Sequence, residues 1–410
     1  MCIQCDTLAH DLSHGCRSCD AVPARGIPRR RTLDYLMAGG LAAWLATQPR
    51  IAQAADDETV RLGYLPITDA TALLVAYAKG FFKDEGLNAE RPTLMRAWAP
   101  MVEAFAAGKF NLVHLLAPLP IWMRYNNHVK VKQIAWAHVN GSAITVGPHS
   151  NINTFADLGG KRVAVPFWYS IHNILLQQAL ANVGIEPILT GAKPTQKQCA
   201  LEVLGPPDML PALAAGKIDA YVVAEPFNAM GEVALNARIL RFTGDMWENH
   251  PCCVACVPEA MVTKNPAWTQ KVANALVRAE HYASAHKIEV AKLISRDGEG
   301  FLPMPAKVVE RAMALYANNP AYLKDGAIQH QGWHDQRIDF KPYPYASAMT
   351  LIVNGLKTTK VAGNADFLAK LDPAFVQNDL VDERFVSAAL AKYPPAGGPE
   401  STTRTEVITI

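Results

Sequence analysis

The amino-acid sequence predicts an α/β protein with two similar lobes. After an N-terminal leader, the chain continues in the order strand, helix, strand, which favours βαβ units and a mainly parallel sheet. A helix-to-strand segment at residues 99–120 recurs at residues 207–228. The chain has 410 residues, which exceeds the usual size of a single small core and is sufficient for two lobes.

Composition excludes several classes of protein. The 39 basic and 37 acidic side chains leave a net charge of +2, which provides no strong positive field for nucleic acid. Hydrophobic residues make up 50% of the chain, so it can form a full core and is not a disordered protein. No uninterrupted apolar stretch approaches the roughly 18 residues of a membrane-spanning helix, which argues against a permease.

The first lobe is predicted to begin with a strand at residues 60–66, which a proline ends. Thr68 or Asp69 then stands where it can cap a helix over residues 70–82. Residues 87–94 are expected to form the second strand. The turn at Thr68 and Asp69 follows a strand, where backbone N–H groups can point at a ligand. Helix capping alone explains these two residues equally well.

The repeat relates the two lobes to each other. At a constant offset of 108 residues (Met101 to Met209), both copies contain Ala-Ala-Gly-Lys, and a proline follows each expected strand at Pro118 and Pro226. Each copy is predicted to form a helix that ends at a glycine, followed by a strand. Two copies of this unit imply two similar lobes, although such units also recur within other α/β proteins.

The second lobe is predicted to begin with a helical turn, a Gly-Gly break and a strand at residues 154–166. Helices are expected at residues 266–286 and 305–317, and crossovers near residues 143–148 and 249–257 would leave a ligand cleft at the carboxyl ends of the strands. The predicted divisions are a leader (1–54), the N-terminal part of lobe 1 (55–148), lobe 2 (149–250), a return to lobe 1 with C-terminal helices (251–393), and a disordered Pro/Gly/Ser/Thr-rich tail (394–410).

The leader has the features of an export signal. Arg29-Arg-Arg-Thr-Leu33 contains the core of a twin-arginine signal, and a short apolar stretch follows at residues 36–46. Residues 52–54 read Ala-Gln-Ala, a small-x-small cleavage pattern that places the mature N-terminus near Ala55. The sequence therefore predicts export by the twin-arginine translocase to the periplasm.

Four cysteines precede this signal as two Cys-x2-Cys pairs, which is the spacing of a four-thiolate zinc site: Cys2, Cys5, Cys16 and Cys19. We hypothesise that these thiols bind Zn²⁺ before export. Cleavage would remove them from the mature protein, and a start codon assigned too far upstream is the alternative.

Six motifs together resemble the solute-binding proteins of ABC importers for nitrate, bicarbonate and sulfonate (NitT/TauT-like). They read GYLPITD, AKGFF, DLGGK, AAGKIDA, AEPFN and WENHP, at residues 63–69, 78–82, 157–161, 214–220, 224–228 and 247–251. Each motif is weak alone, but their order and spacing are specific over roughly residues 59–290. The resemblance implies a type II periplasmic binding protein with two Rossmann-like lobes, two crossover strands and a helical C-terminal extension.

The resemblance also implies a set of ligand-binding residues in the cleft. Trp98 matches a cleft tryptophan, whose indole offers an N–H donor and a flat wall to a planar anion. Ser170 and His172 match a Ser-x-His-Asn pattern at a helix N-terminus, where the helix dipole favours an anion. Ser142 stands where nitrate binders carry a longer amide, which casts doubt on nitrate. A core tryptophan and an ordinary capping histidine are the alternatives for Trp98 and His172.

Glu248 departs from the nitrate binders, which place a lysine at this position of the WENHP motif. A carboxylate there would repel an anion unless a cation intervened. Bicarbonate binders resemble this sequence more because they use an acidic residue with Ca²⁺, and carboxylate oxygens suit that cation. The other interpretations are a neutral or cationic solute, or a Glu248 side chain that points to solvent.

Cys252, Cys253 and Cys256 raise a second class of function. Eukaryotic thiamine-pyrimidine synthases (NMT1/THI5-like) share the fold and carry a cysteine-dense segment at a similar crossover strand. A Cys/metal-dependent enzyme or a pyrimidine-precursor binder is therefore the alternative function. On an extended strand, Cys252 and Cys256 would share one face and Cys253 the other. Buried apolar packing, or a disulfide between Cys199 and one of the three, are further interpretations.

We expect a non-enzymatic, monomeric component that captures a small solute between two lobes. Its expected partners are an ABC permease and ATPase at the inner membrane, with no nucleic acid. No cofactor is expected to be required, although Ca²⁺ at Glu248 could accompany the solute.

Overall fold

The computed structural model describes residues 59–410 except 190, 192, 315, 317, 318, 334 and 400. These residues belong to one compact unit, Thr47–Ile410. The predicted leader, including the twin-arginine motif and the cysteines Cys2, Cys5, Cys16 and Cys19, lies outside the described residues. In the part of the chain that the structure describes, no helix is long and apolar enough to cross a membrane.

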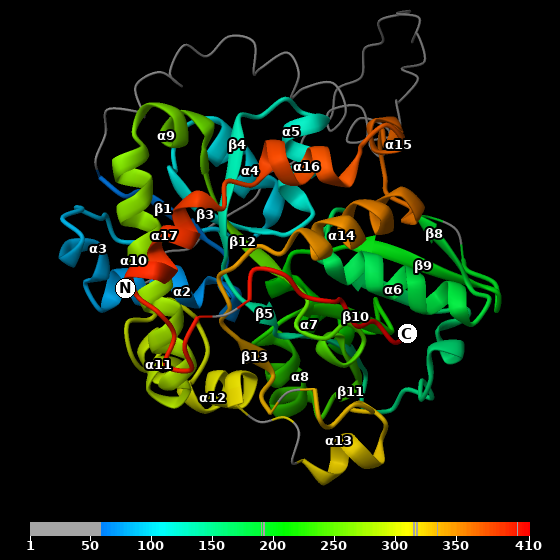
Figure 1. Ribbon diagram of the computed structural model, residues 1–410. Helices are drawn as coiled ribbons and strands as arrows, with labels where there is room; N and C mark the ends of the chain where they lie inside the picture. The colour runs from blue at the N-terminus through cyan, green and yellow to red at the C-terminus, as the bar shows by residue number, and fades with distance from the viewer. Residues whose placement is uncertain are drawn as a thin grey trace, which may run out of the picture. The chain divides into compact units, whose positions relative to one another are not determined.

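Two larger sheets form the centres of two lobes (Figure 1). The first sheet has the strand order β2-β1-β3-β12-β4, made of β1 (Leu62–Tyr64), β2 (Thr93–Leu94), β3 (Leu112–Leu116), β4 (Val131–Trp136) and β12 (Cys253–Pro258). The second has the order β11-β6-β10-β7-β9-β8, made of β6 (Ser142–Val146), β7 (Arg162–Val165), β8 (Glu186–Leu189), β9 (Gln198–Val203), β10 (Ala220–Ala224) and β11 (Arg238–Phe242).

Both sheets are mixed. In the first, β1 runs parallel to β2 and β3, whereas β12 runs antiparallel to β3 and β4. In the second, β7 runs parallel to β9 and β10, and β6 runs antiparallel to β10 and β11. The antiparallel strands β6 and β12 are the ones that follow the two crossings between lobes. The first crossing lies between β4 and β6, earlier than the predicted residues 143–148.

A third, two-stranded sheet lies at this crossing. It pairs β5 (Val139–Asn140) with β13 (Ile338–Asp339) from the C-terminal part of the chain.

The helices follow the predicted order with shorter bounds. The first-lobe helices are η2 (Thr68–Ala70), α2 (Thr71–Ala78), α3 (Phe81–Asp84), α4 (Trp98–Ala106) and α5 (Leu119–Tyr125). The second-lobe helices are η3 (Phe155–Leu158), α6 (Ile171–Asn182), α7 (Pro206–Ala214), α8 (Phe227–Leu235) and η4 (Thr243–Asp245). The single helix predicted over residues 70–82 is interrupted because Gly80 adopts a left-handed φ of 75°.

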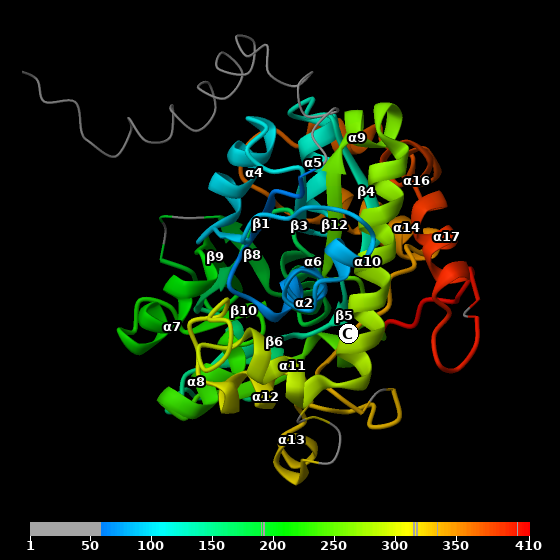
Figure 2. The same cartoon turned by 90° about the vertical axis from the view of Figure 1, so that its left-hand side faces the viewer.

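The chain after β12 is mostly helical, as predicted. Its helices are α9 (Glu259–Lys264), α10 (Pro266–Ala285), α11 (Lys287–Ile294), α12 (Ala306–Ala314), α13 (Pro320–Lys324), α14 (Ala346–Thr358), α15 (Asp366–Ala369), α16 (Pro373–Leu380) and α17 (Arg384–Lys392). The long helix α10 packs against α2 and α17 (Figure 2). The strand predicted over residues 87–94 is limited to β2, with one further bridge between Val60 and Ala89.

The internal repeat is confirmed as the same unit in each lobe. Helix α4 and strand β3 of the first lobe recur as α7 and β10 of the second. The first and last residues of α7 and β10 lie 108 positions after those of α4 and β3. The helices end before Gly108 and Gly216, which both have a positive φ that favours glycine. One copy therefore provides a strand to each of the two larger sheets.

The last residues of the chain differ from the predicted disordered tail. Glu406 accepts a hydrogen bond from the Trp247 indole at 2.7 Å, and the backbone N–H of Glu248 donates to the Val407 carbonyl at 3.0 Å. The side chain of Asn182 donates to the Ile410 carbonyl at 2.9 Å. Composition does not predict these contacts because they depend on distant residues of the second lobe.

Candidate functional site

Asp69 is placed at the site by the turn that follows β1. Helix η2 begins directly after this turn, and both Thr68 and Asp69 are fully buried. Neither residue caps the helix with its side chain, so the capping interpretation is wrong. The backbone N–H and the hydroxyl of Thr68 both donate to the carbonyl of Glu225, at 2.8 and 3.1 Å. Thr68 therefore joins the two lobes, and Asp69 lies between them.

The two crossings run beside each other and supply the next group of residues. Val139 bridges Pro251 in antiparallel orientation, and the N–H of Asn140 donates to the His250 carbonyl at 3.0 Å. His138 lies in the first crossing, and Cys252 lies at the end of the second, one residue before β12. This pairing brings residues that are more than a hundred positions apart in sequence to the same place.

The expected strand alternation would place Cys252 and Cys253 on opposite faces of the sheet. In the structure, their side chains instead point to the same place. Both thiols donate to Oδ2 of Asp69, at 3.3 and 3.0 Å. The difference arises because β12 begins at Cys253, so Cys252 is not yet part of the extended ladder. Cys256 lies further along the strand, beyond an irregularity in the pairing of β12 with β4, and is also buried.

The four cysteines that the structure describes all have free thiols: Cys199, Cys252, Cys253 and Cys256. The interpretation of a disulfide involving Cys199 is therefore wrong in this structure. Cys199 lies on β9 of the second lobe, and burial raises the pKa of its thiol to about 12.

Asp69, His138, Cys252 and Cys253 form one compact cluster, and each is completely buried. One potential ligand atom from each residue lies within 4.8 Å of the others. His138 Nε2 is 3.0 Å from Asp69 Oδ2, the oxygen that also receives both thiols. We call these four residues the Asp-His-Cys-Cys cluster.

The second lobe adds Ser142 and His172 to the edge of this cluster. The hydroxyl of Ser142, the first residue of β6, lies 2.9 Å from His172 Nε2 and 3.5 Å from the Cys252 sulfur. His172 Nε2 is itself 3.9 Å from that sulfur. Among the predicted site residues, Asp69, Ser142 and His172 are thus brought together.

Burial and mutual charge perturb the acid–base properties of the cluster. Burial raises the pKa of Asp69 to about 6, and Cys252 adds to this effect while His138 opposes it. Burial would lower the pKa of His138, but the adjacent Asp69 carboxylate outweighs it and raises that pKa to about 10. Burial also opposes ionisation of Cys252, yet the Cys253 hydrogen bond and the nearby imidazoles hold its pKa well below the usual thiol range. Cys252 is therefore the thiol of the pair that ionises first.

Several buried polar atoms of the cluster and of other candidate site residues have no hydrogen-bond partner among the described residues. They are Asp69 Oδ1, Trp98 Nε1, His138 Nδ1, both side-chain heteroatoms of Asn140, and His172 Nδ1. Burying polar groups without a partner is costly, so such a concentration is typical of a place where a ligand binds.

Trp98 is buried in the first lobe. It is the first residue of α4, and its ring packs edge-on against His114, with 5.5 Å between ring centroids. His114 Nε2 accepts the backbone N–H of Leu65 at 2.9 Å, and burial lowers the pKa of His114 to about 3. Trp98 is buried, as expected for a core tryptophan, but its indole N–H has no partner among the described residues.

Ser170 and Glu248 occupy different environments from the cluster. The hydroxyl of Ser170 accepts the N–H of Asn173 at 3.1 Å, as an N-cap of α6, and donates to the Phe167 carbonyl at 2.8 Å. Glu248 is half-buried beside the C-terminal tail and is not part of the Asp-His-Cys-Cys cluster. The structure does not bring either residue together with Asp69.

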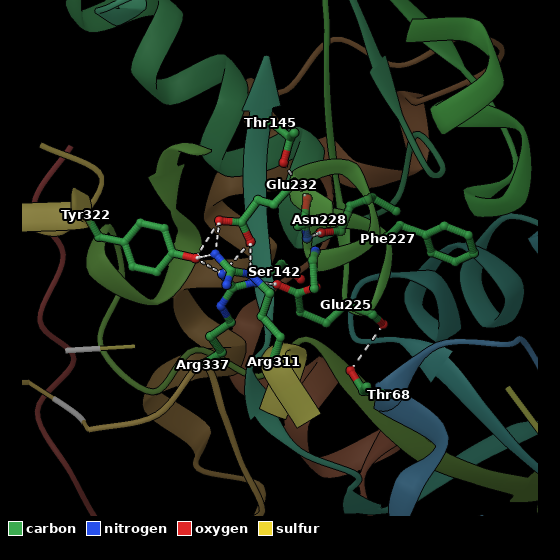
Figure 3. A network of polar contacts seen from close by, with 12 residues as sticks. Thr68, Ser142, Thr145, Glu225, Phe227, Asn228, Glu232, Arg311, Tyr322 and Arg337 are labelled. Atoms are coloured by element: carbon green, nitrogen blue, oxygen red, sulfur yellow. Dashed lines mark hydrogen bonds and ion pairs between the residues drawn. The ribbon is translucent and has the colours of Figure 1, made fainter. Parts of the chain in front are cut away.

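A network of ion pairs lies on the other side of Thr68 (Figure 3). The buried guanidinium of Arg337 donates to Glu225 at 2.7 Å and to Glu232 at 2.6 Å, and it also contacts the Tyr322 hydroxyl. Arg311 binds the same Glu232 carboxylate through two hydrogen bonds of 3.0 and 2.9 Å. Glu225 also accepts the N–H of Ala229, so it braces the second lobe.

Two surface cavities lie away from the cluster. One, of about 330 Å³, is lined by residues that include Lys287, Trp333 and Asp339, and the other, of about 490 Å³, lies beside Phe82 and Arg91. No residue of the cluster borders either cavity.

Sequence reasoning missed His138, because it belongs to none of the six motifs. It connected Cys252 and Cys253 with a Cys/metal-dependent enzyme, apolar packing or a disulfide, but not with Asp69 or His138. Both crossings were expected beside the cleft, but the first lies earlier than the predicted residues 143–148, so the proximity of residues 137–142 to residues 250–253 was not predicted.

Comparison with known proteins identifies relatives among nitrate-binding and bicarbonate-transport proteins. Over 313 residues, the chain is 26% identical to the nitrate/nitrite binding protein NrtA of Nostoc sp. PCC 7120. This alignment covers 70% of this chain and 67% of that protein. Over 254 residues, it is 27% identical to the bicarbonate transport ATP-binding protein CmpC of Synechocystis sp. PCC 6803. That match covers 58% of this chain but only 37% of CmpC, so the chain spans just over a third of that relative.

The fold is shared with a solved periplasmic binding protein. The periplasmic nitrate-binding protein NrtA from Synechocystis PCC 6803 superposes with a TM-score of 0.69 at 19% identity, over 86% of this chain and 94% of that one. This confirms the predicted type II periplasmic binding protein fold. Residues 53–295 match the model of the NMT1-like family. Since that match covers more than half of the sequence, the chain belongs to the NMT1-like family.

Proposed function

We propose that this protein is the substrate-binding component of an ABC importer, which captures a small solute between its two lobes and delivers it to a permease. The observation that carries the proposal is the buried set of polar residues drawn from both lobes: Asp69 from the first, Ser142 and His172 from the second. The relationship to NrtA supports the nitrate, bicarbonate or sulfonate class of solute.

The unpartnered donors favour a solute with several acceptor oxygens. Trp98 Nε1, Asn140 Nδ2 and His172 Nδ1 can each donate a hydrogen bond. A ligand that touches both lobes stabilises the closed arrangement by its differential affinity for that state. The permease would then recognise the closed form. The ATPase partner, periplasmic location and export by the twin-arginine translocase belong to the same proposal.

The test is ligand-induced stabilisation measured with a panel of nitrate, bicarbonate with and without Ca²⁺, alkane sulfonates and pyrimidines. A true ligand at 100 times its Kd raises the free energy of unfolding by about 2.7 kcal/mol. His172→Gln should reduce the stabilisation, whereas His149→Gln, at an exposed histidine, should preserve it.

Two results would contradict the proposal. One is the absence of saturable stabilisation by every member of the panel. The other is turnover: a new product formed with iron and pyridoxal phosphate, and lost in Cys252→Ala, would favour the enzymatic alternative.

A further inference from the structure

We propose that Asp69, His138, Cys252 and Cys253 form a buried four-ligand site for a divalent transition-metal cation of the Zn²⁺ class. This inference does not depend on the proposed solute-binding function. It rests on the geometry, the donor chemistry and the unpartnered atoms of the Asp-His-Cys-Cys cluster.

The geometry of the cluster is close to that of a tetrahedral site. Cys252 Sγ, Cys253 Sγ and His138 Nε2 lie 3.3, 3.0 and 3.0 Å from Asp69 Oδ2. Ligand atoms that bind Zn²⁺ at about 2.0–2.3 Å in tetrahedral geometry are roughly 3.3–3.8 Å apart. The three distances from Asp69 Oδ2 are thus within a few tenths of an ångström of this range, and the other ligand atoms lie within 4.8 Å of one another, so small side-chain movements would place all four around a cation.

The donor set selects the kind of cation. Two sulfurs and one imidazole nitrogen suit Zn²⁺ and related transition metals, whereas Ca²⁺ prefers oxygen ligands only. Asp69 and both thiols can become anions, and all four residues are completely buried. A divalent cation would offset two of these three negative charges at a place where water cannot.

Unpartnered atoms provide a second, independent indication of a ligand. Asp69 Oδ1 and His138 Nδ1 are buried and have no hydrogen-bond partner among the described residues. Asp69 could use Oδ1 to approach the cation while Oδ2 moves away from the thiols. The hydroxyl of Ser142, 3.5 Å from the Cys252 sulfur, is placed to support that sulfur as a ligand.

The site would connect the parts of the fold that move when lobes open. Asp69 and Cys253 belong to the first lobe, His138 to one crossing, and Cys252 to the end of the other. A bound cation would therefore fix the two crossings to the first lobe and limit their independent motion.

Cobalt titration tests this site directly. The full chain is used with Cys2→Ser, Cys5→Ser, Cys16→Ser and Cys19→Ser, so that leader thiols cannot bind the metal. The reduced, metal-free protein is titrated with Co²⁺, and the thiolate-to-cobalt charge-transfer absorption and the tetrahedral d–d bands are recorded. We expect one equivalent to bind with both signals, and Zn²⁺ to displace it.

Matched variants locate the ligands. Cys252→Ser, Cys253→Ser and His138→Gln should each weaken Co²⁺ binding at least tenfold. Cys256→Ser removes a buried thiol of the same strand and should leave binding unchanged. Circular dichroism checks that each variant is folded, and Asp69→Asn provides a fourth ligand variant if one of the others is not.

Three outcomes would overturn the proposal. The first is the absence of a thiolate-to-cobalt signal from the folded protein with its leader cysteines replaced. The second is a signal that survives in the folded double variant Cys252→Ser/Cys253→Ser. The third is an equal loss of binding in Cys256→Ser. Stabilisation by the solute is measured separately, without added metal. A failed metal titration can then be distinguished from a failure of the solute-binding function.

Discussion

Thr68 donates two hydrogen bonds to the same backbone carbonyl, that of Glu225 in the opposite lobe, through its N–H and its hydroxyl. The two residues are separated by 157 positions in the sequence. This contact holds the strand-to-helix turn that carries Asp69 against the second lobe.

Replacing Thr68 with valine should favour opening of the lobes. The variant keeps the backbone hydrogen bond and loses the hydroxyl bond, at a cost of about 0.5–1.5 kcal/mol to the closed state. Small-angle X-ray scattering should show a larger radius of gyration for Thr68→Val. Thr71→Val is the control, because the Thr71 hydroxyl bonds only within its own turn, to the Thr68 carbonyl. An equal expansion in both variants would contradict this role of Thr68.

Arg337→Met should be among the most destabilising substitutions in the second lobe. The Arg337 side chain is completely buried, and its guanidinium contacts the carboxylates of both Glu225 and Glu232. Its removal leaves Glu225 charged and buried, which typically costs about 3–5 kcal/mol of unfolding free energy. Urea unfolding measures the loss. Adding Glu225→Gln to the variant should recover part of it, and full additivity would argue against a direct ion pair.

Ser170 and His172 should separate into a structural and a binding role. Ser170→Ala removes the N-cap of α6 and should lower the free energy of unfolding by about 1 kcal/mol without changing solute affinity. His172→Gln should lower affinity, because His172 lies against Ser142 and Cys252. Comparing urea unfolding with a solute titration distinguishes the two. A loss of affinity in Ser170→Ala that exceeds that of His172→Gln would reverse the assignment.

Asp379 should make a pH-dependent contribution to stability. Hydrogen bonds from Arg124, followed by that from Tyr125, lower the pKa of Asp379 to about 2. Because this pKa lies below that of the unfolded chain, about 3.9, the stabilisation is present above pH 4 and is lost as the pH falls toward 2. Asp379→Asn should cost about 1 kcal/mol at pH 7 and progressively less below pH 4. Urea unfolding from pH 7 to 3 measures this, with Asp366→Asn, at an exposed position, as the control.

Glu248→Gln should leave solute binding independent of Ca²⁺. The backbone of Glu248 pairs with the C-terminal tail, and its carboxylate lies outside the cluster that faces Ser142 and His172. We expect bicarbonate-induced stabilisation to be equal with and without added Ca²⁺, in both wild type and variant, within about 0.5 kcal/mol. A Ca²⁺ requirement that disappears in Glu248→Gln would restore the calcium interpretation.

The repeat made the fold predictable, because Gly108 and Gly216 end equivalent helices before equivalent strands. Sequence proposed Asp69 from its strand-to-helix turn, and Ser142 and His172 from the family resemblance; in the structure all three lie next to Cys252. His138 and the Cys252–Cys253 pair were not placed together from sequence, because their proximity arises from two crossings that are far apart in sequence. The start of β12 at Cys253, which decides where Cys252 points, depends on tertiary pairing rather than on local propensity.

The position of β12 between β3 and β4 has a consequence for the order of folding. Within the first sheet, β4 pairs only with β12, a strand that follows the whole second lobe in sequence. During synthesis, β3 and β4 must therefore wait for more than a hundred further residues before the strand that joins them emerges. Such non-local pairing slows folding and leaves edges open to aggregation. The first lobe, although it is made first, can only be completed last.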